Sequence, residues 1–179
     1  MTRRFYIWEL FAVLVMASAA ALHAAETLRI VPIASEDAVV VSFELSDAYS
    51  DELRQAISSG LRTQFTYDIE LRMVVPAWVD RTIASVVVNT IDQYDNLTRR
   101  HSLSRTVDGR VQDAAVTEDD STARKWLTTL ARIPLIETSK LDPNRDYYVR
   151  ISARARPHGG SLIGWANAIT GQAKFTFIP

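Results

Sequence analysis

Apolar and polar side chains alternate along most of this chain, and a period of two is typical of β-strands with one buried face. The longest alternating stretch covers residues 65–75, and shorter ones cover 39–45, 147–156 and 173–177. Residues 83–88 are apolar at all but one position, which predicts a central strand covered on both faces. The pattern therefore predicts a protein built mainly from sheets.

A first short helix is predicted for residues 51–59. Ser50 precedes it and can cap its free backbone N–H groups, and Gly60 follows it and can close its C-terminal end. The acidic residues Asp51 and Glu52 suit the positive end of the helix dipole. One apolar face of this helix is formed by Leu53, Ala56 and Ile57.

A second helix is predicted for residues 118–132. Thr117 is the expected N-cap, and Pro134 is expected to end the helix because proline cannot donate the hydrogen bond that a further turn requires. The helical spacing of the apolar positions predicts that Trp126 lies in the core of the protein. These apolar positions are Ala123, Trp126, Leu127 and Leu130.

Short connections join the predicted strands, which favours antiparallel pairing because parallel strands need long crossovers. Asp108-Gly109 tolerates the positive φ angles of a two-residue turn and predicts a β-hairpin there. We expect a mainly β fold, an antiparallel β-sandwich-like sheet with two short packed helices, for which an immunoglobulin-like arrangement is one option. The apolar segment 161–169 is expected to fold back over the core as a lid, and insertion into a membrane interface is the alternative.

The start of the chain has the layout of a secretory signal. Arg3-Arg4 gives a positive start, residues 10–22 form an apolar core, and the small residues Ala24-Ala25 end the segment. The apolar core is shorter than the roughly 20 residues that cross a bilayer, so we expect cleavage, with a retained anchor as the alternative. The sequence thus predicts a signal peptide over 1–25 and a single exported β-rich domain over 26–179.

Composition excludes several classes of function. The chain has 179 residues, a formal net charge of -1 and no cysteine. The near-neutral charge gives no reason to expect nucleic acid as a partner, and the lack of cysteine excludes disulfides, thiol catalysis and a lipidated N-terminal cysteine. The sequence has neither a phosphate-binding loop nor a metal-ligand motif, so we expect no cofactor and no metal.

A hairpin rich in basic residues is the main candidate for a binding surface. Arg99, His101 and Arg105 share one face of its first strand, and Arg100 lies on the other face. Polar side chains on both faces cannot all be buried, so this hairpin should project or form an edge. A second row of arginines is expected on the outward face of strand 147–156. The candidate surface comprises Arg99, Arg100, His101, Arg105, Arg110, Arg150, Arg154 and Arg156.

A basic surface of this kind suits an anionic partner. We expect that partner to be another envelope or membrane protein, and contact with the headgroups of a membrane surface is also open. The alternative is a solvated edge hairpin, whose charges serve only to keep the edge of the sheet from pairing with other chains. The sequence gives no prediction of the oligomeric state.

Two other classes of function stay open. An envelope hydrolase would need a concave site where Asp80, Asp92, Asp95 or His101 converge, although the chain has no Gly-x-Ser-x-Gly motif to present a nucleophile. The same carboxylates could gather around Ca²⁺, but their spacing is not that of a calcium-binding loop. A carrier protein would instead hold an apolar ligand between the sheet and segment 161–169.

Several short motifs follow one another in a fixed order: Trp78-Val79-Asp80-Arg81, the run from Tyr94 to Arg105, Trp126-Leu127-Thr128, Ile133-Pro134-Leu135 and Tyr147-Tyr148-Val149-Arg150. This ordered set resembles an uncharacterised family of small exported bacterial proteins, domain of unknown function 4390. The resemblance implies no activity, cofactor or catalytic residue. Members often lie beside membrane sensor kinases by gene position, which implies a signalling partner. We therefore expect a non-catalytic binding or accessory protein in the periplasm or envelope of a bacterium.

Overall fold

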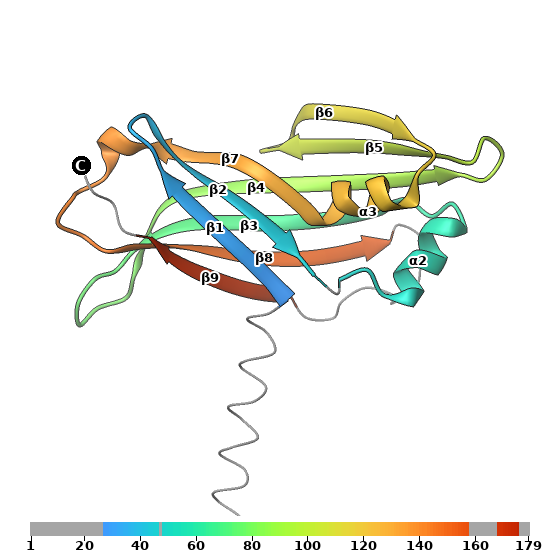
Figure 1. Cartoon of the computed structure of the whole chain (residues 1–179). Helices are drawn as coiled ribbons and strands as arrows, with labels where there is room; N and C mark the ends of the chain where they lie inside the picture. The colour runs from blue at the N-terminus through green and yellow to red at the C-terminus, as the bar shows by residue number, and fades with distance from the viewer. Residues whose placement is uncertain (1–26, 47, 158–167, 176–179) are drawn as a thin grey trace, which may run out of the picture.

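The computed structural model describes residues 27–46, 48–157 and 168–175, which form two antiparallel sheets and two α-helices (Figure 1). The smaller sheet has the order β1-β2-β7, and its strands are Leu28–Ala34, Ala38–Leu45 and Thr129–Glu137. The larger sheet has the order β6-β5-β4-β3-β8-β9, and its strands are Arg110–Thr117, Arg100–Val107, Arg81–Asp95, Thr63–Met73, Tyr147–Pro157 and Ile169–Phe175. The helices are α2 (Asp51–Ser58) and α3 (Asp120–Thr128), and a short 3-10 helix, η1, covers Thr138–Lys140.

Strands β3 and β8 show how the alternating pattern builds the core. On β3 the polar residues between the apolar ones are only partly buried. The apolar residues of β3 are fully buried, namely Phe65, Tyr67, Ile69 and Leu71. On β8 the inward row is buried in the same way, namely Tyr147, Val149, Ile151, Ala153 and Ala155. The strands expected over 65–75 and 147–156 are therefore confirmed, within two residues at each end.

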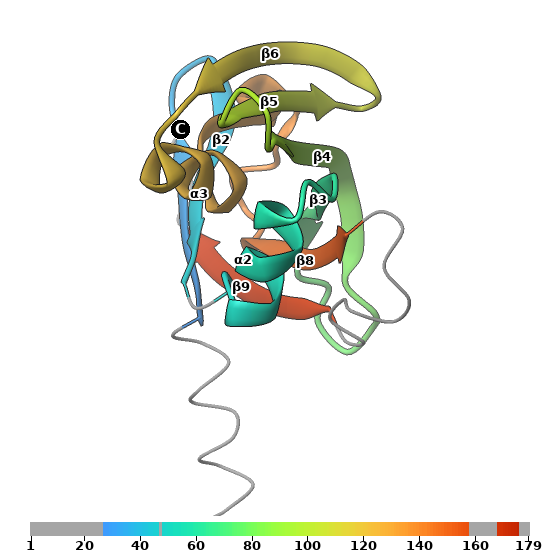
Figure 2. The ribbon, with the colours of Figure 1, turned by 90° about the vertical axis from the view of Figure 1, so that its right-hand side faces the viewer.

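The smaller sheet covers one face of the larger sheet, so the two form a sandwich (Figures 1 and 2). Phe43 on β2 and Tyr67 on β3 join the two layers, with ring centroids 4.9 Å apart. Strand β1 passes close to β9 where Gly171 has no side chain, since a Cβ there would lie 3.1 Å from Leu28 Cδ2. The expected mainly β, antiparallel, sandwich-like fold with two packed helices is confirmed.

Strand β4 is central in the larger sheet, as expected, but it is not covered on both faces. Val86 and Val88 are buried on the face toward the smaller sheet. On the opposite face, called the outer face below, Ser85 is exposed and Val87 is only partly buried. The prediction of two covered faces is wrong because branched apolar residues also suit the pleated surface of a half-exposed strand.

Helix α2 forms where its cap signals place it. The Ser50 hydroxyl accepts a hydrogen bond from the Leu53 N–H at 3.3 Å. At the other end, Gly60 has a φ of 84° and donates its N–H to the Ile57 carbonyl at 2.8 Å. Glycine adopts this left-handed backbone without the clash that a Cβ would cause. The predicted apolar face is buried, namely Leu53, Ala56 and Ile57.

Helix α3 begins later than its sequence pattern predicts. Its first residue is Asp120 and its N-cap is Asp119, not the expected Thr117. The Asp119 carboxylate accepts hydrogen bonds from the N–H groups of Ser121 at 3.4 Å and Thr122 at 2.8 Å. The Thr117 hydroxyl instead accepts a hydrogen bond from the Asp119 N–H. Thr117 therefore helps to position the N-cap residue and is not itself the N-cap. Aspartate is among the strongest N-cap residues, which explains the shift.

Helix α3 also ends earlier than predicted, at Thr128, and the chain continues directly into β7. The Leu127 carbonyl at the free end of the helix accepts hydrogen bonds from the hydroxyls of Tyr67 at 2.6 Å and Thr90 at 3.0 Å. These hydrogen bonds from the larger sheet satisfy a backbone carbonyl at the C-terminal end of α3. The helix therefore ends before the chain reaches Pro134, and the proline is not what ends it. Pro134 lies within β7, an edge strand paired only with β2, where proline is tolerated.

The predicted hairpin at Asp108-Gly109 is confirmed. Asp108 has a φ of 48° and Gly109 a φ of 77°, the pair of positive angles that a type I′ turn needs. The Asp108 carboxylate also accepts a hydrogen bond from the Val87 N–H at 2.9 Å, which ties the turn to β4. Strand β6 forms an edge of the larger sheet, so the hairpin is an edge element as expected.

Two expectations concern residues that the structure does not describe. The expected signal peptide over 1–25 lies outside the described residues, and so do positions 161–167 of the expected lid. Both stay predictions. Among the helices that are described, none has the length and apolar character needed to cross a membrane.

Candidate functional site

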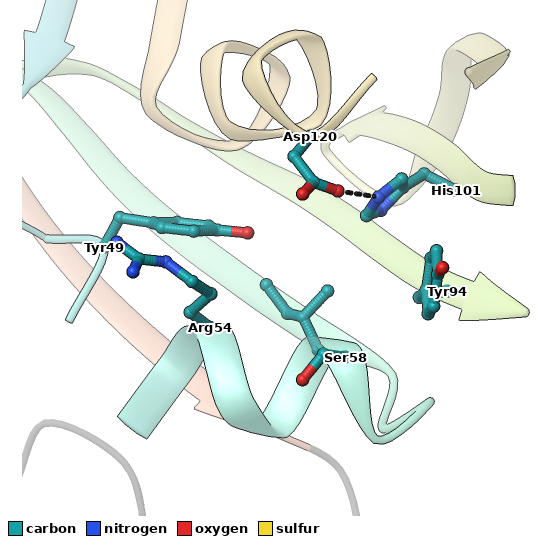
Figure 3. Close-up of a pocket in the computed structure, with 7 residues that line it drawn as sticks. Tyr49, Arg54, Ser58, Tyr94, His101 and Asp120 are labelled. Atoms are coloured by element: carbon teal, nitrogen blue, oxygen red, sulfur yellow. Dashed lines mark hydrogen bonds and ion pairs between the residues drawn. The ribbon is translucent and has the colours of Figure 1, made fainter. Parts of the chain in front are cut away.

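A histidine between two carboxylates lies at the end of the larger sheet nearest to α2 and α3, and Figure 3 shows its contact with one of them, Asp120. His101 Nδ1 is 2.9 Å from Asp92 Oδ2, and His101 Nε2 is 2.9 Å from Asp120 Oδ1. Tyr94 and His101 face each other across β4 and β5, and Asp92 projects from the same face two residues earlier. Asp120 comes from the first turn of α3. We call Asp92, His101 and Asp120 the acid–histidine cluster.

The acid–histidine cluster runs from the interior to the solvent. The Asp92 side chain is fully buried and that of His101 is 2% exposed, whereas that of Asp120 is 88% exposed. Each of the two contacts is a hydrogen bond if one hydrogen lies between its two polar atoms. This condition is met, for instance, when each ring nitrogen of His101 carries a hydrogen. Burial raises the pKa of Asp92, and the hydrogen bond from His101 offsets part of that rise. The contact between Asp92 and His101 thus lies where water has little access, and only Asp120 connects the cluster to the solvent.

A pocket of about 130 Å³ opens beside the cluster. Tyr94 packs against His101 with ring centroids 4.7 Å apart, and the Tyr49 hydroxyl points into the space between α2 and α3 (Figure 3). Burial, together with the negative charges of Asp92 and Asp120, raises the pKa of Tyr49 to about 12. The pocket is lined by Tyr49, Arg54, Ile57, Ser58, Tyr94, His101 and Asp120.

The cluster can hold and pass on a proton, but it does not include an activated nucleophile. Asp92 contacts Nδ1 of His101, which is the way a carboxylate orients a histidine that acts as an acid or base. The other ring nitrogen is occupied by Asp120. Ser58, the serine that lines the pocket, donates its hydroxyl hydrogen to the Gln55 carbonyl at 3.0 Å.

Of the acidic residues that the sequence grouped into one site, only Asp92 reaches His101. Asp80 lies before β4, about 40 Å from Asp92 at the usual rise of a strand. Asp95 ends β4 and accepts a hydrogen bond from the Leu97 N–H at 2.8 Å, so it shapes the next turn. The expected convergence is therefore wrong for Asp80 and Asp95. Among the described residues, no group of three or more acidic, histidine or cysteine side chains could hold a metal ion.

Two members of the predicted basic surface, His101 and Arg105, point toward the protein interior. They share a strand face with Leu103 and Val107, and this is the face that turns toward the core. The Arg105 guanidinium lies over the ring of Trp126, 4.6 Å from its centroid, and burial lowers its pKa. The prediction that these two residues form an exposed platform is wrong, because the apolar neighbours on that face favour its burial.

The contact with Arg105 also defines the position of Trp126. The prediction of a core tryptophan is wrong, since Trp126 is only partly buried. Its indole N–H donates to the Ser104 carbonyl at 3.4 Å, and Arg105 donates to the Trp126 carbonyl at 3.4 Å. A covered indole needs a partner for its N–H, and the sheet provides one here. The neighbouring Leu127 takes the core position instead.

The other basic residues of the hairpin are exposed. Arg99 lies in the turn before β5 with a φ of 55°, and Arg110 begins β6 directly after the hairpin turn. Arg100 lies on the outer face of β5, where its Nε is 3.0 Å from Glu118 Oε1. These positions are compatible with contact to a partner, but they no longer form one surface with His101 and Arg105.

The arginine row of β8 has the predicted orientation. Arg150, Arg154 and Arg156 are all exposed on the outer face, and Arg154 pairs with Asp68 on β3. Strands β3 and β4 lie between this row and β5, so hairpin and row are not adjacent. They nevertheless share the outer face, because Arg100 projects from the same side of the sheet.

Fold and site together define a small antiparallel β-sandwich domain with an acid–histidine cluster beside a pocket at one end. Residues 23–158 match the family described as Domain of unknown function (DUF4390), and the chain belongs to this family. The match extends through β8 and includes both helices and the whole cluster. The family that the ordered motifs predicted is thereby confirmed. No curated protein and no solved structure matches the chain.

Sequence reasoning named Asp92 and His101 together as candidates for a hydrolase site, but it grouped them with Asp80 and Asp95 and missed the role of Asp120. A signal for the pair was available, since Asp92 occupies an inward position of a strand and a buried carboxylate needs a partner. Asp120 gave no such signal, because acidic residues are ordinary in the first turn of a helix. The contact between Asp120 in the first turn of α3 and His101 on β5 is seen only in the folded structure.

Proposed function

We propose that the protein is a non-catalytic binding or accessory module, exported to the bacterial cell envelope, that contacts an acidic partner there. The observation that carries this proposal is the exposed row of Arg150, Arg154 and Arg156 on the outer face. Residues two apart on a strand project from the same face about 7 Å apart, so the row presents its charges along one line. An acidic protein surface of matching spacing could engage them together.

The charges around the row favour an acidic partner over a basic one. Strands β3, β8 and β9 turn more basic than acidic side chains toward the outer face: Arg72, Arg150, Arg154, Arg156 and Lys174 against Asp68 and Glu70. A surplus of one sign on an exposed face steers an oppositely charged partner and sets its orientation. Binding through this face should therefore weaken as salt concentration rises.

The polar groups next to the row are already ordered. Asn89 Oδ1 accepts hydrogen bonds from Gln64 Nε2 at 2.9 Å and from the Thr66 hydroxyl at 2.8 Å. Ser152 and Thr170 link β8 to β9 through their hydroxyls, 3.1 Å apart. A surface whose side chains are fixed before binding loses less conformational entropy when a partner arrives.

Export and the type of partner are supported by the sequence. The signal-like layout of residues 1–25 supports export. The resemblance to family members encoded beside membrane sensor kinases supports a membrane signalling protein as the partner. The lack of cysteine agrees with a domain that needs no disulfide to be stable outside the cytoplasm.

A photo-crosslinking amino acid on the outer face tests the proposed surface in living cells. Ser152 lies within the arginine row, and Arg29 on β1 is an exposed control position in the other sheet. We expect a discrete covalent adduct from position 152 and none from position 29. Charge reversal of the whole row should abolish that adduct and leave the circular dichroism melting curve unchanged, because these side chains are exposed.

Two outcomes would reject this surface: equal adducts from both positions, or an adduct at position 152 that survives charge reversal of the row. Reversal of the exposed residues Arg29, Arg62 and Arg132 supplies a control with the same change in net charge. Export is tested separately by fractionating cells and sequencing the N-terminus of the product. Retention of the whole product in the cytosol would reject the envelope role.

An acid–base enzyme is a second candidate function, favoured by the acid–histidine cluster beside the pocket. Chromogenic acyl esters, phosphate esters and glycosides test it as substrates. Turnover that His101→Gln abolishes, and whose pH profile Asp120→Asn displaces, would support this function. No turnover of any of these substrate classes, or turnover unchanged by His101→Gln, would reject it.

A further inference from the structure

The loop between β3 and β4 carries a run of exposed apolar residues at its tip. Pro76, Ala77, Trp78 and Val79 are all exposed, Trp78 by 82% and Val79 by 75%. The loop projects beyond the sheet at the end opposite to α2 (Figure 1). Large apolar side chains grouped on a protrusion mark a contact site, because soluble domains seldom expose them together. We call residues 76–79 the tryptophan tip.

Hydrogen bonds at its base hold the tryptophan tip in place. The Asp80 carboxylate accepts hydrogen bonds from the Val75 N–H at 3.2 Å and from the Tyr148 hydroxyl at 2.9 Å. Arg72 donates to the Asp80 carbonyl at 2.8 Å, and the Trp78 N–H donates to the Val75 carbonyl at 3.1 Å. The exposed side chains are thus presented by a loop whose base is held by four hydrogen bonds.

The backbone of the tip is strained at the residue before Trp78. Ala77 has a φ of 60°, a left-handed conformation that costs an alanine roughly 1–2 kcal/mol. Pro76 before it and the hydrogen bond from Trp78 to Val75 fit a type II turn, in which glycine would normally take the place of Ala77. Strain of this kind tends to occur where a function requires it.

A lipid surface suits the tip better than a protein socket. The tip is convex and small, whereas a stable protein interface buries about 800 Å² on each side. Tryptophan favours the boundary between headgroups and acyl chains, where its ring is apolar and its N–H reaches polar groups. The Trp78 N–H, which is already bonded to the Val75 carbonyl, needs no partner from the membrane.

Basic residues surround the base of the tip. Arg81 lies two residues after Val79, beyond the acidic Asp80, and is exposed. Arg72 and Lys174 lie close enough to Asp80 for their charges to act on its carboxylate. Each lysine or arginine near an anionic leaflet adds about 1 kcal/mol of attraction. The apolar side chains of the tip and the basic side chains near its base therefore suit, respectively, the apolar part and the anionic headgroups of a bilayer.

We propose that the tryptophan tip inserts into the headgroup region of an anionic lipid bilayer, with Arg81 and Lys174 placed against lipid phosphates. This inference goes beyond the acidic protein partner proposed above, because it assigns a second contact of different chemistry to the tip, although Arg72 and Lys174 belong to both surfaces. It does not depend on the outer-face proposal, and either can fail alone.

The lack of cysteine allows a clean test with the full chain. Val79→Cys and Leu97→Cys are each labelled with a polarity-sensitive fluorophore. Leu97 is the matched control, since it is 95% exposed and lies at the other end of the sheet. With vesicles of phosphatidylglycerol and phosphatidylethanolamine, we expect a blue shift and quenching by brominated acyl chains at position 79 but not at position 97. Comparing two positions in one chain separates the tip from any membrane contact made elsewhere.

Variants then identify the groups responsible. Trp78→Ser in the labelled protein should lower the vesicle partition coefficient by about tenfold or more, because a large apolar side chain no longer leaves water. Arg81→Glu with Lys174→Glu should lower binding to anionic vesicles and leave the weaker binding to phosphatidylcholine unchanged.

Equal responses at positions 79 and 97, or none at position 79, would overturn the proposal. A shift at position 79 that requires solubilised membrane proteins and is missing with pure lipid would also overturn it, and would assign the tip to a protein socket. Urea unfolding of Trp78→Ser shows whether the variant stays folded, as expected for an exposed residue.

Discussion

His101 Nδ1 lies 2.9 Å from Asp92 Oδ2, and this contact joins two neighbouring strands inside the protein. Asp120 extends the contact to the surface through the other ring nitrogen of His101. One histidine therefore faces a buried carboxylate on one side and a hydrated one on the other. The two contacts should differ in energy, because water screens only the second.

That difference can be measured by removing the partners one at a time. We expect His101→Ala and Asp92→Ala each to destabilise the protein by about 3 kcal/mol or more, since each leaves a buried polar group without its partner. Asp120→Ala should cost at most about 1 kcal/mol, as exposed ion pairs do. Urea unfolding of the variants and of the Asp92/His101 double variant tests this. Equal losses for Asp120→Ala and Asp92→Ala would contradict it.

The alkaline titration of Tyr49 gives a second prediction. Its pKa of about 12 is due first to burial and then to the charges of Asp92 and Asp120. Because the folded pKa exceeds the ordinary value of about 10, the bound proton favours the folded state below pH 10, and this contribution is lost as the pH rises from about 10 to 12.

Asp120→Asn should therefore lower the pKa of Tyr49 and leave it above the ordinary value, since burial remains. The absorbance titration of the wild type minus that of Tyr49→Phe isolates the signal of this one tyrosine. A pKa that is unchanged in Asp120→Asn would show that the carboxylate does not act on Tyr49.

The N-cap of α3 gives a prediction about acid. Hydrogen bonds from the side chains of Thr122 and Ser121 hold the pKa of Asp119 far below its ordinary value. A lowered pKa stabilises the folded state above the unfolded pKa of about 4, and this stability is lost as the pH falls below it. Asp119→Ala should lower the unfolding midpoint at pH 7, and the difference from wild type should shrink toward low pH. Glu36→Ala, at an exposed turn, is the control and should show neither effect.

Arg105 and Arg150 should respond differently to the same substitution, although the sequence assigns both to one surface. Arg105→Ala removes a contact over the Trp126 ring and should cost about 1 kcal/mol and shift tryptophan emission to longer wavelength. Arg150→Ala should change stability by less than about 0.5 kcal/mol, because the side chain is exposed. Equal losses from the two variants would mean that Arg105 has no structural role.

The parts of this fold that depend on a few neighbouring residues could be predicted from the sequence. The caps at Ser50 and Gly60, the turn at Asp108-Gly109 and the alternation over 65–75 all follow from local backbone preference or strand periodicity. Each of these signals lies within a short window of the chain, so the rest of the molecule did not need to be known.

The candidate site depended on segments that are distant in sequence. The periodicity of β5 showed that His101 and Arg105 share a face, but which face is buried is decided by the elements packed on it. The end of α3 depended on the hydroxyls of Tyr67 and Thr90 in another layer. The exposure of Trp78 was equally hidden, because a tryptophan next to a strand is more often buried.

The 15-residue strand β4 begins just after the tryptophan tip and ends beside the pocket. Its residues 88–92 are paired on both edges, by β3 and β5, whereas residues 81–87 pair with β3 alone and include a register irregularity near Ile83. At the usual rise of a strand, the chain from Arg81, just after the tip, to Tyr94 at the pocket spans at most about 40 Å. With the tip in a bilayer, the pocket would therefore stand up to about 4 nm away from it, and soluble molecules would reach its mouth from the aqueous side.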